Sequence, residues 1–428
     1  MYRELMLEKV ISMLHGKTSL TGHELVRSVS IDSRSTRPGA LFFALHGNRT
    51  DGHEYTTHAL DRGACAVVVD HTTGCEQEII VNDTLHALGT LAQAYRKAYA
   101  SKGVKTIAVT GTNGKTTVKN AIAGILSMEQ EVLSTKKNYN SLIGLPLTLF
   151  DLGPQHEYMV LEMGTSRPGE IARLCEIAQP DIGVITRIGA GHLQDLGSLA
   201  GVRKEKLSLI RSLPAHGTGF IGEGVGDIRG DNIINIDKSL LFNIEISEHD
   251  TTFTYQGHEF TTPLLGAANV YNCLIALYVT QHIGVAYSVQ CDALRRIRPE
   301  PGRLVPFQRG DILIIDDTYN ANPLSMRAAI DFAVQIDRPR IFILGDMLEL
   351  GVYAKNMHEE IGRIAQQNCD LLLTFGPLAR YYGGVNFSDK GELVQHVMAS
   401  LSGNEMILVK ASRGLCFEDI IELLLEEL

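Results

Sequence analysis

The strongest chemical signal in the sequence is a glycine-rich segment that ends in a lysine and two threonines, Gly111-Thr-Asn-Gly114-Lys115-Thr116-Thr117. It follows an apolar run at 104–110 and precedes a segment whose apolar residues recur at helical spacing. In a strand–loop–helix of this kind, the loop amides and the N-terminus of the helix hold phosphate oxygens. We expect Lys115 to contact the β- and γ-phosphates of a nucleotide, and the Thr116 hydroxyl to bind Mg²⁺.

This loop departs from the standard eight-residue phosphate loop, because Val109 stands where that motif has its first glycine. The alternative is a glycine-rich turn that binds nothing. The lysine and threonines lie in the strand–loop–helix context that phosphate binding requires, and this favours the phosphate-binding interpretation.

Two further polar side chains follow buried strands of the same region. Glu162 lies in the apolar run 158–163, and His192 follows the run at 182–186. Since parallel strands present their carboxyl ends at one edge of a sheet, Glu162 is placed to ligate Mg²⁺ directly or through water, unless it is a solvated strand end. A lone histidine is more often structural, and Lys206, considered by itself, is an ordinary lysine of a helix surface.

Other candidate residues lie near a proline- and glycine-rich segment at 296–304. Arg303 follows a glycine there, and its guanidinium could fold onto a phosphate held between two domains. Asp316 and Asp317 end the next buried strand, where a carboxylate can accept a hydrogen bond from a ribose, although a turn is the alternative. The following Asn320-Ala-Asn322-Pro is unusual enough to favour function.

Two polar loop clusters occur earlier in the chain, Asp32-Ser33-Arg34 and Asp51-Gly52-His53. Aspartate, serine and glycine are common turn residues, so turn formation alone is a sufficient explanation for either cluster considered in isolation.

The elements that must position these residues form an α/β protein of three domains, a number that suits 428 residues at ~150 per domain. Apolar runs alternate with helical segments, and the alternation restarts after 296–304. The predicted units are a small α/β domain at 1–84, a central domain with a parallel sheet around the phosphate loop at 85–299, and a C-terminal Rossmann-like domain at 300–428. Within the central domain, the glycine- and threonine-rich stretch 214–262 is predicted to form β-hairpins.

Composition argues against several classes of protein. With 39 basic and 49 acidic residues, the net charge of −10 argues against broad binding to nucleic acids or anionic membranes. Seven scattered cysteines without a C-x-x-C pair indicate reduced thiols in a cytoplasmic protein. The N-terminal segment has no signal-peptide core and no apolar run reaches 18 residues, so we expect no membrane insertion.

Considered together and in this order, the motifs resemble those of the Mur ligase family of ATP-dependent amide-bond-forming ligases, over nearly the whole chain. The stretches that carry the resemblance are IDSRSTRPGALFFALHGNRTDGHEY, VTGTNGKTTVKN, KNYNSLIGLPLTL, LEMGTSRPGEIA, GHLQDLGSLAGVRKEKL, LLGAANVYN, IIDDTYNANPLSM, ILGDMLELG with His358, and LVKASRG. They are most similar to the family member that joins D-alanyl-D-alanine to UDP-N-acetylmuramoyl-tripeptide in peptidoglycan precursor synthesis. The resemblance implies an acyl-phosphate intermediate, a C-terminal domain that closes over the site, and a monomer.

The resemblance also implies roles for individual residues. It implies a uridine-nucleotide site in domain 1–84, an ATP site in the central domain, two Mg²⁺ ions and a CO₂-derived carbamate on Lys206. The implied ATP contacts are Gly111, Thr112, Asn113, Gly114, Lys115, Thr116, Thr117, Asn269, Asn272, Arg303 and Asp317; the metal ligands are Thr116, Glu162, His192 and Lys206. The implied catalytic residues are Lys115, Lys206 and His192, and the substrate contacts are Ser33, Arg34, Asp51, Gly52, His53, Asn138, Asn140, Tyr319, Asn320, Asn322, Lys410, Ser412 and Arg413.

Several positions depart from the family pattern, and other functions stay open. The departures are Arg187, Gln194, Ala268, Leu207-Ser208 and Ala411. A ligase that adds diaminopimelate or lysine would carry Asp-Asn-Pro-Arg where this chain has Asn-Ala-Asn-Pro, and a folylpolyglutamate synthase would lack the first domain. A phosphate-loop nucleotide sensor is the alternative from a different class, but it would not need Glu162, His192 and Lys206 together.

Overall fold

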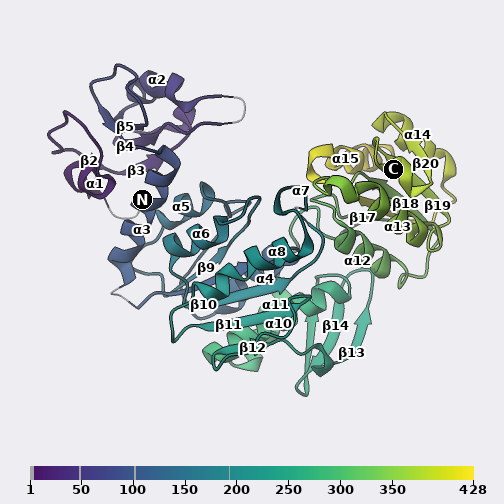
Figure 1. Cartoon of the computed structure of the whole chain (residues 1–428). Helices are drawn as coiled ribbons and strands as arrows, with labels where there is room; N and C mark the ends of the chain where they lie inside the picture. The colour runs from purple at the N-terminus through teal and green to yellow at the C-terminus, as the bar shows by residue number, and fades with distance from the viewer. Residues whose placement is uncertain (1–3, 48–49, 101–102, 192) are drawn as a thin grey trace.

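The computed structural model describes residues 4–47, 50–100, 103–191 and 193–428. Three α/β units lie in a row, from the N-terminal unit in purple through the teal centre to the C-terminal unit in yellow-green (Figure 1). The predicted α/β class with three domains is confirmed, while the division of the chain at 84/85 and 299/300 remains our proposal. No helix in the described ranges has the length and apolar character needed to cross a bilayer.

The N-terminal unit is a four-stranded parallel sheet in the order β3-β4-β5-β6. Residues of β4 and β5 are buried on both faces of the sheet: Leu41 and Val68 pack in the core that α3 also enters, and Phe42 and Val67 pack on the other face. The elements are β1 (Leu5–Met6), α1 (Leu7–Leu14), β2 (Leu25–Val26), β3 (Ser28–Ser30), η1 (Ser33–Ser35), β4 (Ala40–Phe43), η2 (Gly52–Tyr55), α2 (Thr56–Asp61), β5 (Ala64–Val69), β6 (Glu78–Ile80) and α3 (Thr84–Ala100).

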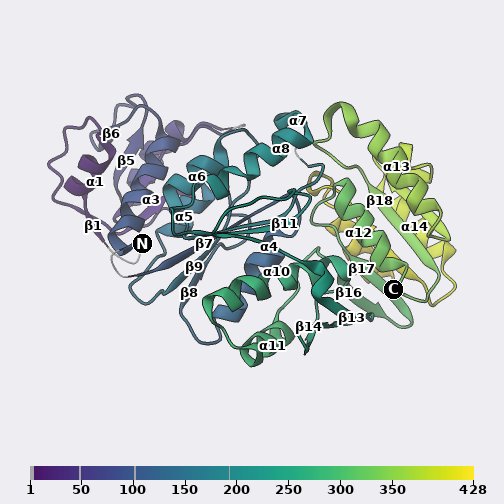
Figure 2. The same ribbon diagram turned by 60° about the horizontal axis from the view of Figure 1, so that its bottom comes forward.

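The central unit is built on a six-stranded parallel sheet in the order β12-β11-β10-β7-β9-β8. Helices α4, α10 and α11 share a core with one face, and α3, α5 and α6 pack on the other, as Figure 2 shows from below. The bounds are β7 (Lys105–Thr110), α4 (Lys115–Leu126), β8 (Val132–Ser134), α5 (Gly144–Leu149), β9 (Tyr158–Glu162), α6 (Glu170–Ala178), β10 (Ile182–Arg187), α7 (Leu193–Leu196), α8 (Leu199–Lys206), α9 (Ser208–Arg211), β11 (Thr218–Glu223), β12 (Ile233–Asn235), η3 (Lys238–Leu240), α10 (Ala267–Ile283) and α11 (Tyr287–Arg296).

The prediction of hairpins across 214–262 is wrong for its first half. There β11 and β12 extend the parallel sheet, because residues 218–221 are buried consecutively, as in an inner parallel strand. The second half does form an antiparallel sheet, with β13 (Leu241–Ile246), β14 (Thr251–Tyr255) and β15 (His258–Thr262).

The C-terminal unit is a six-stranded sheet in the order β16-β17-β21-β18-β19-β20, in which only β16 is antiparallel to its neighbour. Helices α12 and α13 cover one face, and α14 and α15 cover the other. The bounds are β16 (Val305–Arg309), β17 (Ile312–Asp316), α12 (Pro323–Ala333), β18 (Arg340–Gly345), η4 (Gly351–Tyr353), α13 (Ala354–Gln366), β19 (Leu371–Phe375), η5 (Ala379–Tyr382), β20 (Val385–Phe387), α14 (Lys390–Ser400), β21 (Met406–Lys410), η6 (Arg413–Leu415) and α15 (Glu418–Glu427).

The carboxyl ends of strands from the central and C-terminal sheets face one interdomain space. Residues from the ends of β9 and β10 in one sheet, and of β17 and β21 in the other, line the same cavity. Ligands of open α/β sheets bind at such edges, so this space is where the candidate side chains are expected to meet.

Candidate active site

The phosphate loop connects the end of β7 to the start of α4, and its two glycines are required by close packing. Gly111 and Gly114 have φ values of 151° and 83°, which side-chain-bearing residues rarely adopt. A Cβ atom on Gly111 would collide with Thr186, and one on Gly114 would collide with Asn272. The backbone of the loop is therefore pressed against β10 and α10, and residues 112–117 line the cavity.

Lys115 lies across this loop. Its Nζ donates to the carbonyl oxygens of Gly111 at 3.0 Å and Thr112 at 3.1 Å, and no acidic group neutralises it at hydrogen-bond distance among the described residues. Burial lowers the pKa of the Lys115 ammonium, and the nearby Glu162 opposes that effect. A phosphate anion at the loop would supply the negative counter-charge that the Lys115 ammonium lacks.

Two more lysines are buried in the same region. Lys119 is 3% exposed and donates to the Thr135 carbonyl at 2.8 Å, and burial lowers its pKa. Lys206, at the end of α8, is 1% exposed, and its pKa is lowered well below the usual value by burial first and by the charge of Lys115 second. The Lys206 amine is thereby biased toward its neutral, nucleophilic form. It is not the exposed lysine that its sequence context alone suggests.

Glu162 ends β9 and carries an unsatisfied oxygen. Its Oε1 accepts from Asn140 Nδ2 at 2.8 Å, whereas the buried Oε2 has no hydrogen-bond partner. Buried carboxylate oxygens are normally paired, so this one is set up for a ligand outside the chain. Together with the hydroxyl of Thr116, which lines the same cavity, it provides the oxygen donors that Mg²⁺ prefers. The residues present therefore fit a bound Mg²⁺.

Residues of the C-terminal unit reach the phosphate loop directly. Arg303 donates from Nη2 to the Thr116 hydroxyl at 3.1 Å and stacks over the Tyr319 ring at 4.1 Å. Asp317 forms a 2.6 Å ion pair with Lys410, whose side chain is 2% exposed. Arg303 thus contacts the loop, as predicted, whereas Asp317 is paired with Lys410 from the neighbouring strand β21.

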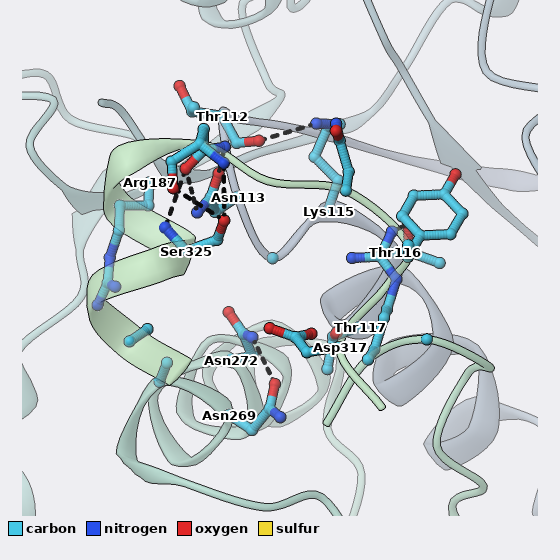
Figure 3. Close-up of a pocket in the computed structure, with 18 of the residues that line it drawn as sticks. Thr112, Asn113, Lys115, Thr116, Thr117, Arg187, Asn269, Asn272, Asp317 and Ser325 are labelled. Carbon is cyan, nitrogen blue, oxygen red and sulfur yellow. Dashed lines mark hydrogen bonds between the residues drawn. The ribbon is translucent and has the colours of Figure 1, made fainter. Parts of the chain in front are cut away.

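The tip of the loop is also joined to α12. The Asn322 side chain caps that helix by accepting from the Ser325 amide at 2.9 Å, and this fixes the orientation of its own amide group. Its Nδ2 then donates to Asn113 Oδ1 at 2.6 Å, and Asn113 Nδ2 donates back to Asn322 Oδ1 at 3.1 Å. Figure 3 shows Asn113 and Ser325 above the Asn269–Asn272 pair, in which Asn272 donates to Asn269 at 3.0 Å.

This cap leads to a stability prediction. Replacing Asn322 by alanine removes the cap and should lower the stability of the C-terminal unit by about 1 kcal/mol. Asn322→Asp keeps the cap and loses only the bond from Nδ2 to Asn113, so it should destabilise the first turn of α12 less. Hydrogen exchange of residues 323–333 measures the local opening free energy in this chain of several domains. Equal exchange in both variants would contradict the role of the cap.

Most predicted ATP and C-terminal site residues line one cavity of about 310 Å³ between the two units. Those on its wall are Thr112, Asn113, Gly114, Lys115, Thr116, Thr117, Asn140, Glu162, Asn269, Asn272, Arg303, Asp317, Tyr319, Asn320, Asn322 and Lys410. Gly111 begins the loop without lining the cavity. Lys206, Asn138, Ser412 and Arg413 are also absent from its wall, although Ser412 donates to the Ala321 carbonyl at 3.3 Å and the Arg413 amide donates to Asn320 Oδ1 at 3.4 Å. His192 lies outside the described residues.

The predicted uridine-site residues are not brought to this cavity. Ser33 and Arg34 lie in η1, and Asp51, Gly52 and His53 lie at the start of η2. Both short helices begin with a capping aspartate, so the turn-forming role of these aspartates is also present. The Ser33 hydroxyl lies 3.0 Å from His58 Nδ1 on α2. These residues lie in the N-terminal unit and do not line the interdomain cavity; Arg34 is exposed, whereas Ser33 and His53 are buried.

Sequence reasoning missed several cavity residues. Thr165 and Ser166 follow Glu162 on the wall, and their place just after a buried strand was the available signal. Arg187, noted only as a departure, lines the cavity with Ala268 and forms an ion pair with Glu223. Ser325 was missed because it enters only through the first turn of α12.

Comparison with known proteins matches all three units. Three family models cover most of the chain, the "Mur ligase family, catalytic domain" at 25–96, the "Mur ligase middle domain" at 109–280, and the "Mur ligase, glutamate ligase domain" at 302–413. The chain belongs to the Mur ligase family. The resemblance drawn from the motifs is thus confirmed at the level of the family.

Among individual Mur ligases, the chain is similar to the UDP-N-acetylmuramoyl-tripeptide–D-alanyl-D-alanine ligases of Bacillus subtilis (strain 168), at 34% identity, and Escherichia coli (strain K12), at 32%. In both cases the match covers 98% of each chain. The crystal structure of MurF from Acinetobacter baumannii superposes with a TM-score of 0.92 at 27% identity, covering 99% of both chains. MurF from Thermotoga maritima in complex with ADP gives 0.86 at 27% identity, covering 94% of this chain and 98% of that one.

Proposed function

We propose that this Mur ligase joins D-alanyl-D-alanine to UDP-N-acetylmuramoyl-tripeptide at the expense of ATP, giving UDP-N-acetylmuramoyl-pentapeptide, ADP and phosphate for peptidoglycan synthesis. The observation that carries the proposal is the interdomain cavity, where a phosphate loop, an unsatisfied carboxylate oxygen and polar groups of the C-terminal unit meet. Full-length similarity to ligases with this named activity supports the choice of substrates.

ATP is proposed to bind with its phosphates on the loop and its adenine toward α10. Lys115 and the amides at the start of α4 offer positive charge to the β- and γ-phosphates. Asn269 and Asn272, at the start of α10, line the same cavity and supply amide groups for the adenine side. The ADP complex of the Thermotoga maritima protein, which shares the fold, supports a nucleotide in this family.

The chemistry follows from the low reactivity of a carboxylate toward an amine. The γ-phosphoryl group of ATP passes to a carboxylate oxygen at the end of the tripeptide, forming an acyl phosphate and ADP. The amine of D-alanyl-D-alanine attacks the acyl carbon, the amide forms, and phosphate leaves with that oxygen. Several negative charges converge in the first step, and Lys115 with the loop amides offsets their repulsion.

Metal ligands are proposed from the donor set described above. Thr116 and Glu162 would hold one Mg²⁺, and His192 with a carbamate on Lys206 would serve a second. Mg²⁺ bound there neutralises charge on the phosphates. Lys206 is buried and favours the neutral amine, which can add CO₂ with the release of one proton to give a carbamate, an anionic oxygen donor.

The peptide substrates are proposed to occupy the remaining walls. The uridine nucleotide would bind near Ser33, Arg34 and the segment Asp51–His53, with the tripeptide running past Asn138 and Asn140. Tyr319, Asn320, Asn322, Lys410, Ser412 and Arg413 would form the C-terminal side, which excludes water from the acyl phosphate. A monomer is proposed only because the family resemblance implies it, and substrates of this class support a cytoplasmic enzyme.

Phosphate release from ATP, measured with a panel of acceptors, tests the substrate choice. We expect substantial phosphate release only when UDP-N-acetylmuramoyl-tripeptide and D-alanyl-D-alanine are both present. Single amino acids, including glutamate, should give little release in place of the dipeptide. Release with diaminopimelate or lysine and a UDP-muramoyl dipeptide would identify a different Mur ligase. Nucleotide binding without acceptor-dependent release would identify a sensor.

A further inference from the structure

A second group of titratable side chains lies in the N-terminal unit, outside the interdomain cavity. His46 follows β4, Asp70 and His71 follow β5, and Asp51 and His53 lie at the start of η2. Strands β4 and β5 pair in parallel with Phe43 beside Val68, so both strands end at the same edge of the sheet. This pairing brings the loops that carry the five residues together.

The two nearest imidazoles are stacked and share two carboxylates. The rings of His46 and His53 lie 4.7 Å apart at 28°. Asp51 faces the Nδ1 atoms of both rings, at 3.1 Å from His46 and 2.6 Å from His53. Asp70 faces the Nε2 atoms of both, at 2.7 Å from His46 and 3.3 Å from His53.

This arrangement assigns different tasks to the two carboxylates. The backbone amide of Asp70 donates to His53 Nε2 at 3.2 Å, so His53 carries its proton on Nδ1 and donates it to Asp51. With His46 in the same tautomer, Asp51 accepts from both rings. The Nε2 atom of His46 then faces the Asp70 carboxylate at 2.7 Å, and that of His53 lies 3.3 Å from the same carboxylate while it accepts from the Asp70 amide. A cation that replaces the 3.2 Å amide contact at His53 Nε2 would meet two imidazole nitrogens and a carboxylate oxygen at this position.

We infer that His46, His53 and Asp70 bind a divalent transition-metal ion of the zinc class, with Asp51 orienting both imidazoles. The three ligand atoms lie within 4.8 Å of one another. Zinc holds imidazole nitrogen and carboxylate oxygen at about 2.0–2.2 Å, so a small movement of the side chains closes the site. The proton on the far nitrogen of each ligating histidine, donated to a carboxylate, is the usual outer support of such sites.

The surroundings favour this metal class and allow it to enter. Imidazole ligands suit zinc, whereas Mg²⁺ prefers oxygen donors such as those near Glu162. The His53 side chain is 3% exposed and rigidly held, while His46 is 56% exposed, which leaves an open side for the ion and a water ligand. His71 stacks on His53 at 4.4 Å and lies 2.6 Å from Asp70, and so holds that carboxylate in place.

Calorimetric titration of the full chain with ZnCl₂, in excess Mg²⁺ and without nucleotide, tests the inference. We expect one zinc ion per chain. Affinity should fall at least tenfold in His46→Gln and Asp70→Asn, and about tenfold in Asp51→Asn, whose carboxylate acts through the imidazoles. His249→Gln, which changes an exposed histidine outside the group, should bind zinc as the parent does. Asp51 and His53 also belong to the segment proposed above for the uridine nucleotide. The titration therefore contains no nucleotide or peptide, and its result does not depend on the proposed ligase activity.

The spectrum of the Co²⁺-loaded parental chain gives a second readout that does not depend on variants. Visible absorption of a four- or five-coordinate nitrogen and oxygen site supports the inference. An intense near-ultraviolet thiolate band would assign the ion to cysteines and overturn it. Absence of saturable zinc binding, or zinc binding that is unchanged in folded His46→Gln and Asp70→Asn, would also overturn the inference. The group would then be only a stack of hydrogen-bonded histidines.

Discussion

Replacing Lys115 by alanine is expected to reduce ligation by at least about 10²-fold and to leave the fold intact. The ammonium lies over the phosphate loop and contacts only backbone carbonyls there, so its contact with the transferring phosphoryl group is gained when substrate is bound. Loss of a charge-assisted contact that strengthens in the transition state costs about 3 kcal/mol or more. Steady-state phosphate release measures the effect.

Lys105→Ala is the matched control, because Lys105 is an exposed lysine at the other end of β7. It should retain parental turnover. The melting temperatures of both variants should stay close to that of the parent. If the folded Lys115→Ala variant kept activity within a few-fold of the parent, this would contradict the proposed role of the phosphate loop in phosphoryl transfer.

The second large effect is expected for Lys206→Arg. If Lys206 carries a carbamate, arginine cannot replace it, because it keeps a positive charge and does not add CO₂. Turnover should then fall by orders of magnitude even at saturating Mg²⁺. A solvated surface lysine would tolerate the exchange within about 0.5 kcal/mol, but Lys206 is buried, so a melting curve must first show that the variant is folded.

Lys204→Arg provides the control on the same helix, since Lys204 is exposed two residues before the buried Lys206. It should behave as the parent does. If arginine unfolds the protein at this buried position, Lys206→Ala gives the same test with a smaller side chain. Near-parental turnover in either folded variant of Lys206 would contradict a carbamate ligand.

The parts of the site that depend on local pattern were predictable from the sequence. The phosphate loop requires a buried strand, two glycines and a helix start, all within residues 104–126. The position of Glu162 followed from the general rule that parallel strands end at one edge of a sheet. Because these signals act over short distances in the chain, composition and periodicity were sufficient to find them.

Contacts between distant segments could not be predicted in this way. Asn113 and Asn322 are 209 residues apart, and their amide pair depends on how two sheets are docked. The burial of Lys206 likewise depends on the packing of α8, because its neighbour Lys204 is exposed and has the same residue type. The glycine-rich pattern of 214–262 was misleading. It predicts a hairpin strand at β11, whereas the structure pairs β11 in parallel with β10, a strand from outside that segment.

The grouping of histidines in the N-terminal unit illustrates the same limit. Asp51-Gly52-His53 read as a turn, and the structure does use Asp51 to cap η2. What local sequence did not reveal is that His46 and Asp70, from the ends of two neighbouring strands, complete a group around His53.

The most direct measurement of the central claim follows one oxygen atom. UDP-N-acetylmuramoyl-tripeptide labelled with ¹⁸O in its terminal carboxylate is incubated with ATP, Mg²⁺ and D-alanyl-D-alanine, and the released phosphate is analysed by mass spectrometry. If the carboxylate is activated as an acyl phosphate, each phosphate should carry one labelled oxygen and appear in step with the pentapeptide. Phosphate without this label would show that ATP is hydrolysed by water and would contradict the proposed ligation.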